Sequence, residues 1–163
     1  MQIGIFIALL QDRSFEAALD DVASAGVSAI EIPTGGYVGN AHANPRILLE
    51  DEVARTAFLS QIARHNLTID ALSCHGNPLH PQQQIAQEHH EAFQDTVRLA
   101  ALLGVDTVIT FSGCPGDGPD ARYPNWVTCP WPNDFRSSAT PMCRSVRMPF
   151  APRSRGCVRC KAG

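Results

Sequence analysis

The sequence has no long hydrophobic run and no signal-like N-terminus. No apolar stretch approaches the roughly 20 residues of a membrane-spanning helix, so no membrane partner is expected. The first seven residues, MQIGIFI, lack both a basic segment and a small-residue cleavage site. We therefore expect a cytoplasmic protein. The 163 residues are enough for one domain with a sizeable core.

Acidic residues are absent beyond Asp134. Residues 1–135 contain all 16 acidic residues and six of the 13 basic ones, which gives this segment a net charge of −10. Residues 136–163 contain seven basic residues and no acidic one, which gives a net charge of +7. This change in composition divides the chain into a domain, residues 1–135, and a basic tail, residues 136–163. The tail has no helical or strand periodicity, which predicts disorder. A frameshift before residue 136 is a second explanation, and translation of the other two reading frames beyond that codon tests it.

Histidine is absent beyond His90, which limits the metal ligands of the tail. Cys157 and Cys160 form a CxxC motif, and Cys143 is the only other cysteine there. A structural zinc site usually needs four ligands from paired motifs, so the ligand set of a zinc-binding tail is incomplete. The tail has one Phe and no recognisable binding motif. Nucleic acid is therefore not an expected partner.

A β-then-α alternation repeats through the first 112 residues. Apolar runs predict strands at residues 3–9, 27–32, 67–73 and 105–111, and helical spacing predicts helices at residues 15–25, 48–65 and 82–103. Strands joined by helices form a parallel sheet, either half of a (β/α) barrel or a small doubly wound sheet. Long loops follow the strands, as in barrels, and the first of these loops lacks the glycines typical of the doubly wound fold. We predict an α/β fold of the (β/α) TIM-barrel type, truncated to about four units because a full barrel typically needs about 250 residues.

The ends of the predicted helices carry specific signals. Ser14 is suited to cap the first helix. Gly26, Asn66 and Gly104 stand where the three helices give way to strands, and Gly and Asn are the residues that end helices in the left-handed conformation. Within residues 48–65, the expected buried stripe consists of Leu49, Val53, Ala57, Leu59 and Ile62.

Side chains suited to chemistry follow the second and third strands. His75 stands where a barrel strand delivers a side chain into the mouth, and a neutral imidazole binds a divalent metal or hydrogen-bonds a hydroxyl. Asn77 offers the donor and acceptor that polyol recognition needs. Glu31 ends the second strand, and His42 lies in the loop after it. A structural interpretation stays open for all four, as backbone partners or surface groups. Residues 89–90, both His, are expected on a solvated helix face.

Several longer stretches resemble a known family. Residues 31–37 (EIPTGGY), 72–81 (LSCHGNPLHP), 110–117 (TFSGCPGD) and 123–132 (YPNWVTCPWP) are similar to the sugar phosphate isomerase/epimerase proteins. These proteins belong to the xylose isomerase-like barrel superfamily, which also contains apurinic-site endonucleases. The resemblance runs through residues 1–135.

The resemblance implies a metal-dependent interconversion of ketoses or related polyols. A divalent Mn²⁺, Mg²⁺ or Zn²⁺ ion polarises adjacent oxygens while a carboxylate moves a proton at carbon. In the isomerase branch the metal ligands come from the second half of the barrel and have no counterpart here, because no acidic residue follows Asp134. His75 is a candidate metal ligand only because a His after the third strand binds metal in the endonuclease branch. The residues expected to bind a sugar or sugar phosphate are Glu31, His42, His75, Asn77 and Ser112.

Three functions remain open. The first is a truncated sugar isomerase or epimerase that is inactive alone and belongs to a longer enzyme. The second is a non-catalytic carbohydrate-binding α/β module that uses its basic tail as an interaction arm. The third is a zinc-binding tail protein. Sugar titration and metal analysis of the purified chain separate them.

Overall fold

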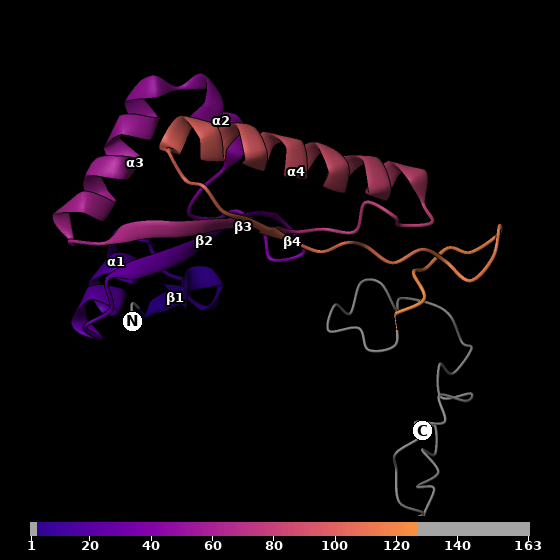
Figure 1. Ribbon diagram of the computed structural model, residues 1–163, viewed down its shortest axis with the longest axis horizontal. Coiled ribbons are helices and arrows are strands. Elements are labelled where there is room, and N and C mark those ends of the chain that lie inside the picture. The colour runs from indigo at the N-terminus through magenta and orange to yellow at the C-terminus, as the bar shows by residue number, and fades with distance from the viewer. Residues whose placement is uncertain (1–2, 127–163) are drawn as a thin grey trace, which may run out of the picture. The chain divides into compact units, whose positions relative to one another are not determined.

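The computed structural model describes residues 3–126. The chain divides into two units, residues 1–126 and 127–163, and the predictions made for Trp131, the CxxC motif and the basic tail lie outside the described residues. In chain order the elements are β1 (Gly4–Phe6), the 3₁₀-helix η1 (Ile7–Leu10), α1 (Phe15–Ser24), β2 (Ala29–Gly36), α2 (Pro45–Glu50), α3 (Glu52–Arg64), β3 (Thr68–His75), α4 (Gln83–Leu103) and β4 (Val108–Thr110). Figure 1 shows α4 running alongside β3 and β4.

The four strands form one parallel sheet in the order β1-β2-β3-β4. Each strand therefore pairs with the next strand in the chain, with a helix between them. A doubly wound sheet reverses its strand order at a switch point, whereas a barrel adds its strands consecutively. The observed order is that of four consecutive barrel strands, as the sequence predicts.

The helix ends follow the predicted signals. Ser14 Oγ accepts a hydrogen bond from the Ala17 amide at 3.3 Å and caps α1. Gly26, Asn66 and Gly104 adopt φ angles of 73°, 56° and 69°, so each helix that precedes a strand ends in a left-handed residue. These short turns place β2, β3 and β4 directly after the helices.

The predicted helix at residues 48–65 is two helices, and its predicted buried stripe is correct for Ile62 and Leu49 but wrong for Val53, Ala57 and Leu59. The chain bends at Asp51, whose carboxylate accepts from the Ala54 amide at 2.9 Å and begins α3. The bend changes which side chains face the core: Val53 is 79% exposed and Leu59 is 37% exposed. The buried apolar residues of α2 and α3 are Leu48, Phe58 and Ile62. A single helical period applied across a cap misassigns the face of the second helix.

The predicted bounds of the first two strands also need correction. β1 ends at Phe6, and the apolar run continues into η1, where Ile7 is completely buried. A continuous apolar run does not distinguish a buried strand from a buried turn. β2 extends to Gly36, into the predicted loop, because a bulge between Pro33 and Gly35 keeps it paired with β3.

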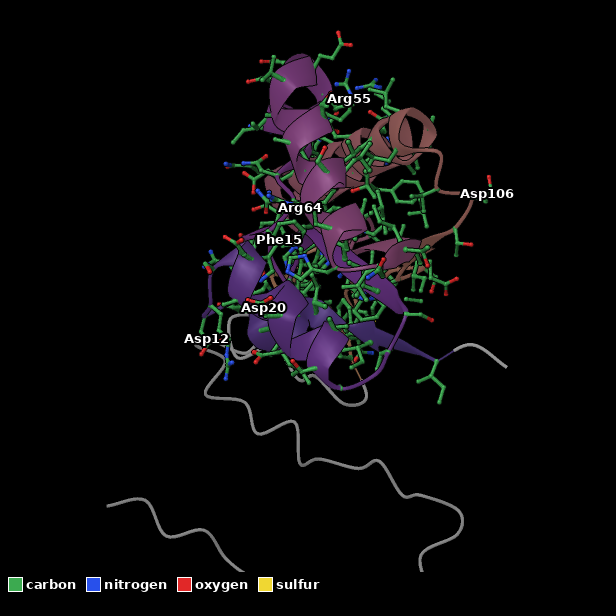
Figure 2. All side chains as sticks on the ribbon, turned by 90° about the vertical axis from the view of Figure 1, so that its left-hand side faces the viewer. Asp12, Phe15, Asp20, Arg55, Arg64 and Asp106 are labelled. Atoms are coloured by element: carbon green, nitrogen blue, oxygen red, sulfur yellow. The ribbon has the colours of Figure 1, made fainter. Side chains whose placement is uncertain are left out.

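The core lies between one face of the sheet and the helices. Ile30, Ile32 and Leu72 are completely buried on this face. The hydroxyl groups of Thr34 in β2 and Thr96 in α4 form a hydrogen bond of 2.8 Å, which connects the helix to the sheet. Figure 2 shows Phe15 between α1 and α3, where its ring stacks on that of Phe58 at 5.0 Å.

Candidate functional site

Three polar side chains share the face of the sheet that points away from the helices. Successive side chains of a strand point to opposite faces, so Glu31 points away from the core-facing Ile30 and Ile32. On β3, Ser73 and His75 likewise alternate with residues of the core face. In a barrel this second face lines the interior, and the ends of its strands carry the catalytic groups.

Glu31 and His75 meet at this inner face. His75 Nε2 lies 3.9 Å from Glu31 Oε1, and the two side chains are 13% and 24% exposed. Burial lowers the pKa of His75, and the nearby Glu31 carboxylate only partly offsets this effect. His75 is therefore a neutral imidazole at neutral pH. Its Nδ1 atom is buried and has no hydrogen-bond partner among residues 3–126.

Aromatic rings enclose His75. The Phe6 ring meets it edge-on at 5.8 Å, and the Phe111 ring lies 4.6 Å away at a tilt of 34°. Trp126 packs edge-on against Phe111 at 6.4 Å. The three rings come from β1, from the residue after β4 and from the loop beyond it. The imidazole consequently lies in a low-dielectric frame with its Nε2 turned toward Glu31.

Ser73 was not predicted from the sequence. Its side chain is completely buried, and its Oγ atom has no hydrogen-bond partner among residues 3–126. Buried polar groups are nearly always hydrogen-bonded, so this hydroxyl, like His75 Nδ1 on the same face of β3, needs a partner from outside the described residues. The signal that was available is the spacing of two, since Ser73 and His75 necessarily share a face of β3.

Asn77 joins the loop after β3 to the loop after β4. Its side chain is completely buried. Its Oδ1 atom accepts from the amides of Leu79 at 3.1 Å and Cys114 at 2.8 Å, and its Nδ2 donates to the Cys114 carbonyl at 2.8 Å. The backbone N–H of Asn77 in turn donates to His89 Nδ1 at 2.8 Å. His89 is therefore a loop anchor, and the solvated face predicted for it is wrong, whereas His90 is exposed.

The other two predicted residues lie differently. His42 Nε2 lies 3.1 Å from the Leu10 carbonyl, and its ring packs on Phe15 at 5.4 Å. Ser112 is exposed directly after Phe111. Of the five predicted substrate-binding residues, the structure brings Glu31 and His75 together, whereas Asn77 and His42 use polar atoms on the chain's own backbone.

The described residues do not complete a metal site. Within residues 3–126, no three His, Cys, Asp or Glu side chains gather in a way that could hold an ion. Glu31 and His75 supply one oxygen and one nitrogen donor, whereas protein-bound divalent metals in catalytic sites usually take at least three protein ligands.

Comparison with known proteins agrees with this geometry. The family model described as the xylose isomerase-like TIM barrel matches residues 19–132. The chain belongs to this family. The family includes sugar isomerases and epimerases as well as other proteins, and membership confirms the predicted TIM-barrel fold class. In residues 3–126, no helix is long and apolar enough to cross a membrane.

A curated relative is longer than this chain. The uncharacterized protein YfiH of Bacillus subtilis (strain 168) is 36% identical over 152 residues, which cover 92% of this chain and 48% of YfiH. The chain therefore spans about half the length of the curated relative it matches.

Proposed function

We propose that this chain carries the substrate-binding part of a sugar or sugar phosphate isomerase or epimerase. The observation that carries the proposal is the pairing of Glu31 with His75 at the inner face, since His75 stands at the C-terminal end of β3, the end at which barrel enzymes do their chemistry. The unpartnered Ser73 Oγ and His75 Nδ1 support it. Hydroxyl-rich ligands offer both donors and acceptors to such groups.

The chemistry follows from the two side chains. Isomerisation and epimerisation begin when a base removes the proton from the hydroxyl-bearing carbon next to a carbonyl, which leaves an enediolate. Isomerisation ends when the base returns the proton to the neighbouring carbon and a proton passes between the two oxygens, whereas epimerisation ends when a solvent proton adds to the opposite face of the original carbon. The Glu31 carboxylate is the base within reach of a bound ketose. The neutral His75 imidazole donates to the carbonyl oxygen, where negative charge develops during proton removal.

The aromatic frame suits the remainder of a sugar. Phe6 and Phe111 present apolar surfaces on two sides of His75, against which the C–H groups of a sugar pack. Exclusion of water by these rings strengthens the hydrogen bonds of Glu31 and His75 to the ligand.

The metal predicted from the family resemblance remains a prediction. Two donors, Glu31 and His75, do not hold a divalent ion alone. Any Mn²⁺, Mg²⁺ or Zn²⁺ needs further ligands from outside residues 3–126. The steps above are accordingly assigned to side chains of this chain.

Titration of the complete chain with ketoses tests the proposal. Ketopentoses, ketohexoses and their phosphates are added to the wild type and to Glu31→Gln and His75→Gln, and binding is measured by calorimetry. We expect each substitution to weaken binding at least about ten-fold, which corresponds to one hydrogen bond to a charged or buried group. Glu91→Gln and His90→Gln, exposed positions on α4, are the matched controls. Failure of every ketose to bind a folded chain would contradict the proposal, as would equal binding by all four variants.

A non-catalytic carbohydrate-binding module is the second candidate. The incomplete metal ligand set of the described residues favours it. Incorporation of deuterium from solvent into a bound ketose separates the two functions, and YfiH, of which the aligned segment is 48%, is the longer protein on which to measure it. Exchange by YfiH that is lost in the variant of its residue aligned with Glu31 supports the enzyme. Sugar binding by both proteins without exchange supports the module.

A further inference from the structure

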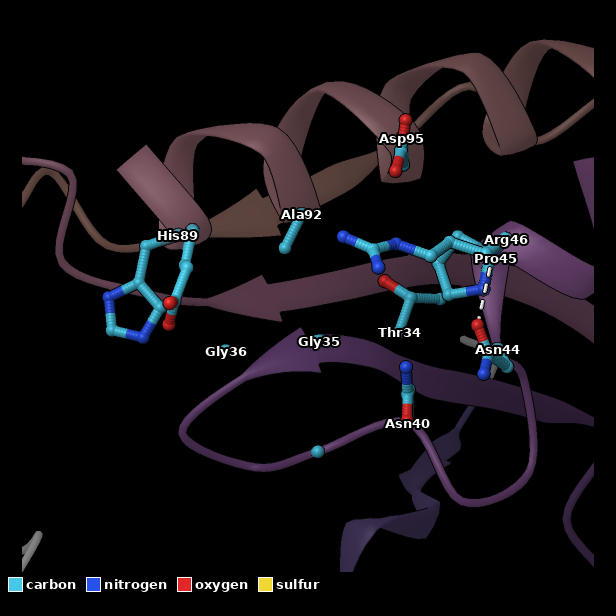
Figure 3. A pocket seen from close by; sticks show the side chains of 12 residues that line it. Thr34, Gly35, Gly36, Asn40, Asn44, Pro45, Arg46, His89, Ala92 and Asp95 are labelled. Carbon is cyan, nitrogen blue, oxygen red and sulfur yellow. Dashed lines mark hydrogen bonds between the residues drawn. The ribbon is translucent and has the colours of Figure 1, made fainter. Parts of the chain in front are cut away.

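A cavity of about 400 Å³ lies on the helix side of the sheet, on the opposite face from Glu31 and His75. Its floor is the end of β2, its first wall is the loop before α2 together with the start of that helix, and its second wall is α4. Figure 3 shows side chains from both walls reaching into the space above Gly35. Its volume is at the lower end of the roughly 300–1,000 Å³ range of small-molecule sites.

The floor is built so that side chains do not fill it. A Cβ atom on Gly35 would lie 3.3 Å from Ala92 Cβ and 3.3 Å from Cys74 Sγ. Gly36 has a φ of +74°, and a Cβ atom there would lie 2.2 Å from the His75 carbonyl oxygen. Glycine is thus required at position 36, a side chain at position 35 would press on Ala92 and Cys74, and main chain faces the cavity.

The two walls carry opposite charges that do not meet. Arg46 extends from α2 toward α4 (Figure 3), and its guanidinium forms no hydrogen bond or ion pair with any of residues 3–126. Asp95 and Glu88 line the wall formed by α4. The Asp95 side chain is only 20% exposed, and one of its oxygens binds the Arg98 guanidinium at 3.0 Å.

We propose that this cavity binds a small zwitterion of the α-amino acid class. The ligand carboxylate pairs with the Arg46 guanidinium, and the ligand ammonium pairs with Asp95 and Glu88 on the opposite wall. A simple anion meets two carboxylates, a simple amine meets the guanidinium, and a neutral polyol leaves the Arg46 guanidinium without an ion pair. A dipolar ligand alone satisfies both walls, and charge-assisted hydrogen bonds are the strong ones in such sites. The Asn40 carboxamide, which also lines the cavity, adds a donor and an acceptor.

Binding to the complete chain tests this proposal. Each of the common L-amino acids is titrated by calorimetry, with acetate and methylamine as probes that carry a single charge. At least one amino acid is expected to bind, and acetate and methylamine are expected to bind at least ten-fold more weakly. Arg46→Gln and Asp95→Asn should each weaken amino acid binding at least ten-fold.

The controls keep the test informative. Arg64→Gln and Glu91→Gln change exposed charges outside the cavity and should leave amino acid binding unchanged. Glu88→Gln repeats the test on the acidic wall if Asp95→Asn lowers the thermal midpoint. The proposal is overturned if no amino acid binds the folded chain, if Arg46→Gln binds as well as wild type, or if inorganic phosphate binds more tightly than any amino acid.

Discussion

Replacement of Asn77 by alanine should destabilise the fold strongly, although the residue lies in a loop. The side chain is completely buried and makes three hydrogen bonds, to the amides of Leu79 and Cys114 and to the Cys114 carbonyl. Each such bond contributes about 1 kcal/mol net, and a buried group left without a partner costs about 1–3 kcal/mol. Because Leu79 is exposed and Cys114 is partly exposed, water replaces part of the loss. We therefore expect Asn77→Ala to lower the free energy of unfolding by about 2–4 kcal/mol.

Urea unfolding followed by circular dichroism measures this change, and hydrogen exchange locates it. The amide of Cys114 should exchange faster in the variant, because its acceptor is Asn77 Oδ1. Asn125→Ala is the matched control, since Asn125 is exposed and surface substitutions usually change stability by less than about 0.5 kcal/mol.

A loss below about 0.5 kcal/mol for Asn77→Ala would refute this reasoning. The alternative role predicted from the sequence, a substrate ligand, makes the opposite forecast. In that case Asn77→Ala weakens ketose binding and leaves the urea midpoint and the Cys114 exchange rate unchanged.

Three further predictions follow from the geometry. Burial lowers the pKa of His75 below the value of 6.5 in the unfolded chain, so the unfolded state binds the proton more readily. Stability should therefore fall as the pH drops below about 6.5. His75→Gln should remove that part of the pH dependence in thermal melts. Gly36→Ala should lower the free energy of unfolding by about 3 kcal/mol, because it combines a left-handed φ with a Cβ contact of 2.2 Å. Gly104→Ala, which has open space around the added Cβ atom, should lower it by about 1–2 kcal/mol in the same urea unfolding assay. Burial raises the pKa of the Cys74 thiol, so iodoacetamide should label Cys114 in the native protein and Cys74 only after unfolding. Peptide mass spectrometry measures the labelling of each cysteine. Equal labelling of both in the native protein would contradict the buried position of Cys74.

The strand order and the helix ends could be predicted because they depend on local chemistry. Gly26, Asn66 and Gly104 are left-handed residues where a helix gives way to a strand, and the spacing of four apolar runs is visible in the chain. The bend at Asp51 was missed because an acid inside a helical pattern is also an ordinary solvent-facing residue. Its capping role becomes evident only from the bond to Ala54.

Only part of the site could be predicted, because local patterns do not determine contacts between strands. His75 stands at the end of β3, as the sequence predicts, whereas Glu31 is the third residue of β2 and does not end that strand. Their 3.9 Å contact depends on the register of β2 against β3. Ser73 was not predicted because a serine inside an apolar strand does not by itself indicate a functional residue. Only its spacing of two from His75 shows that the two residues share a face of β3. The anchoring role of His89 depends on the path of the loop after β3, which helical spacing does not determine.

Histidine side-chain NMR of the complete chain during a ketose titration tests the central claim most directly. Long-range ¹H–¹⁵N spectra resolve the ring nitrogens of each histidine and their protonation. We expect a ketose or ketose phosphate to shift the His75 nitrogen signals and Glu31→Gln to diminish this shift. The nitrogen signals of the exposed His90 should not change. A folded chain in which no sugar moves the His75 signals would contradict the assignment of the inner face as a sugar site.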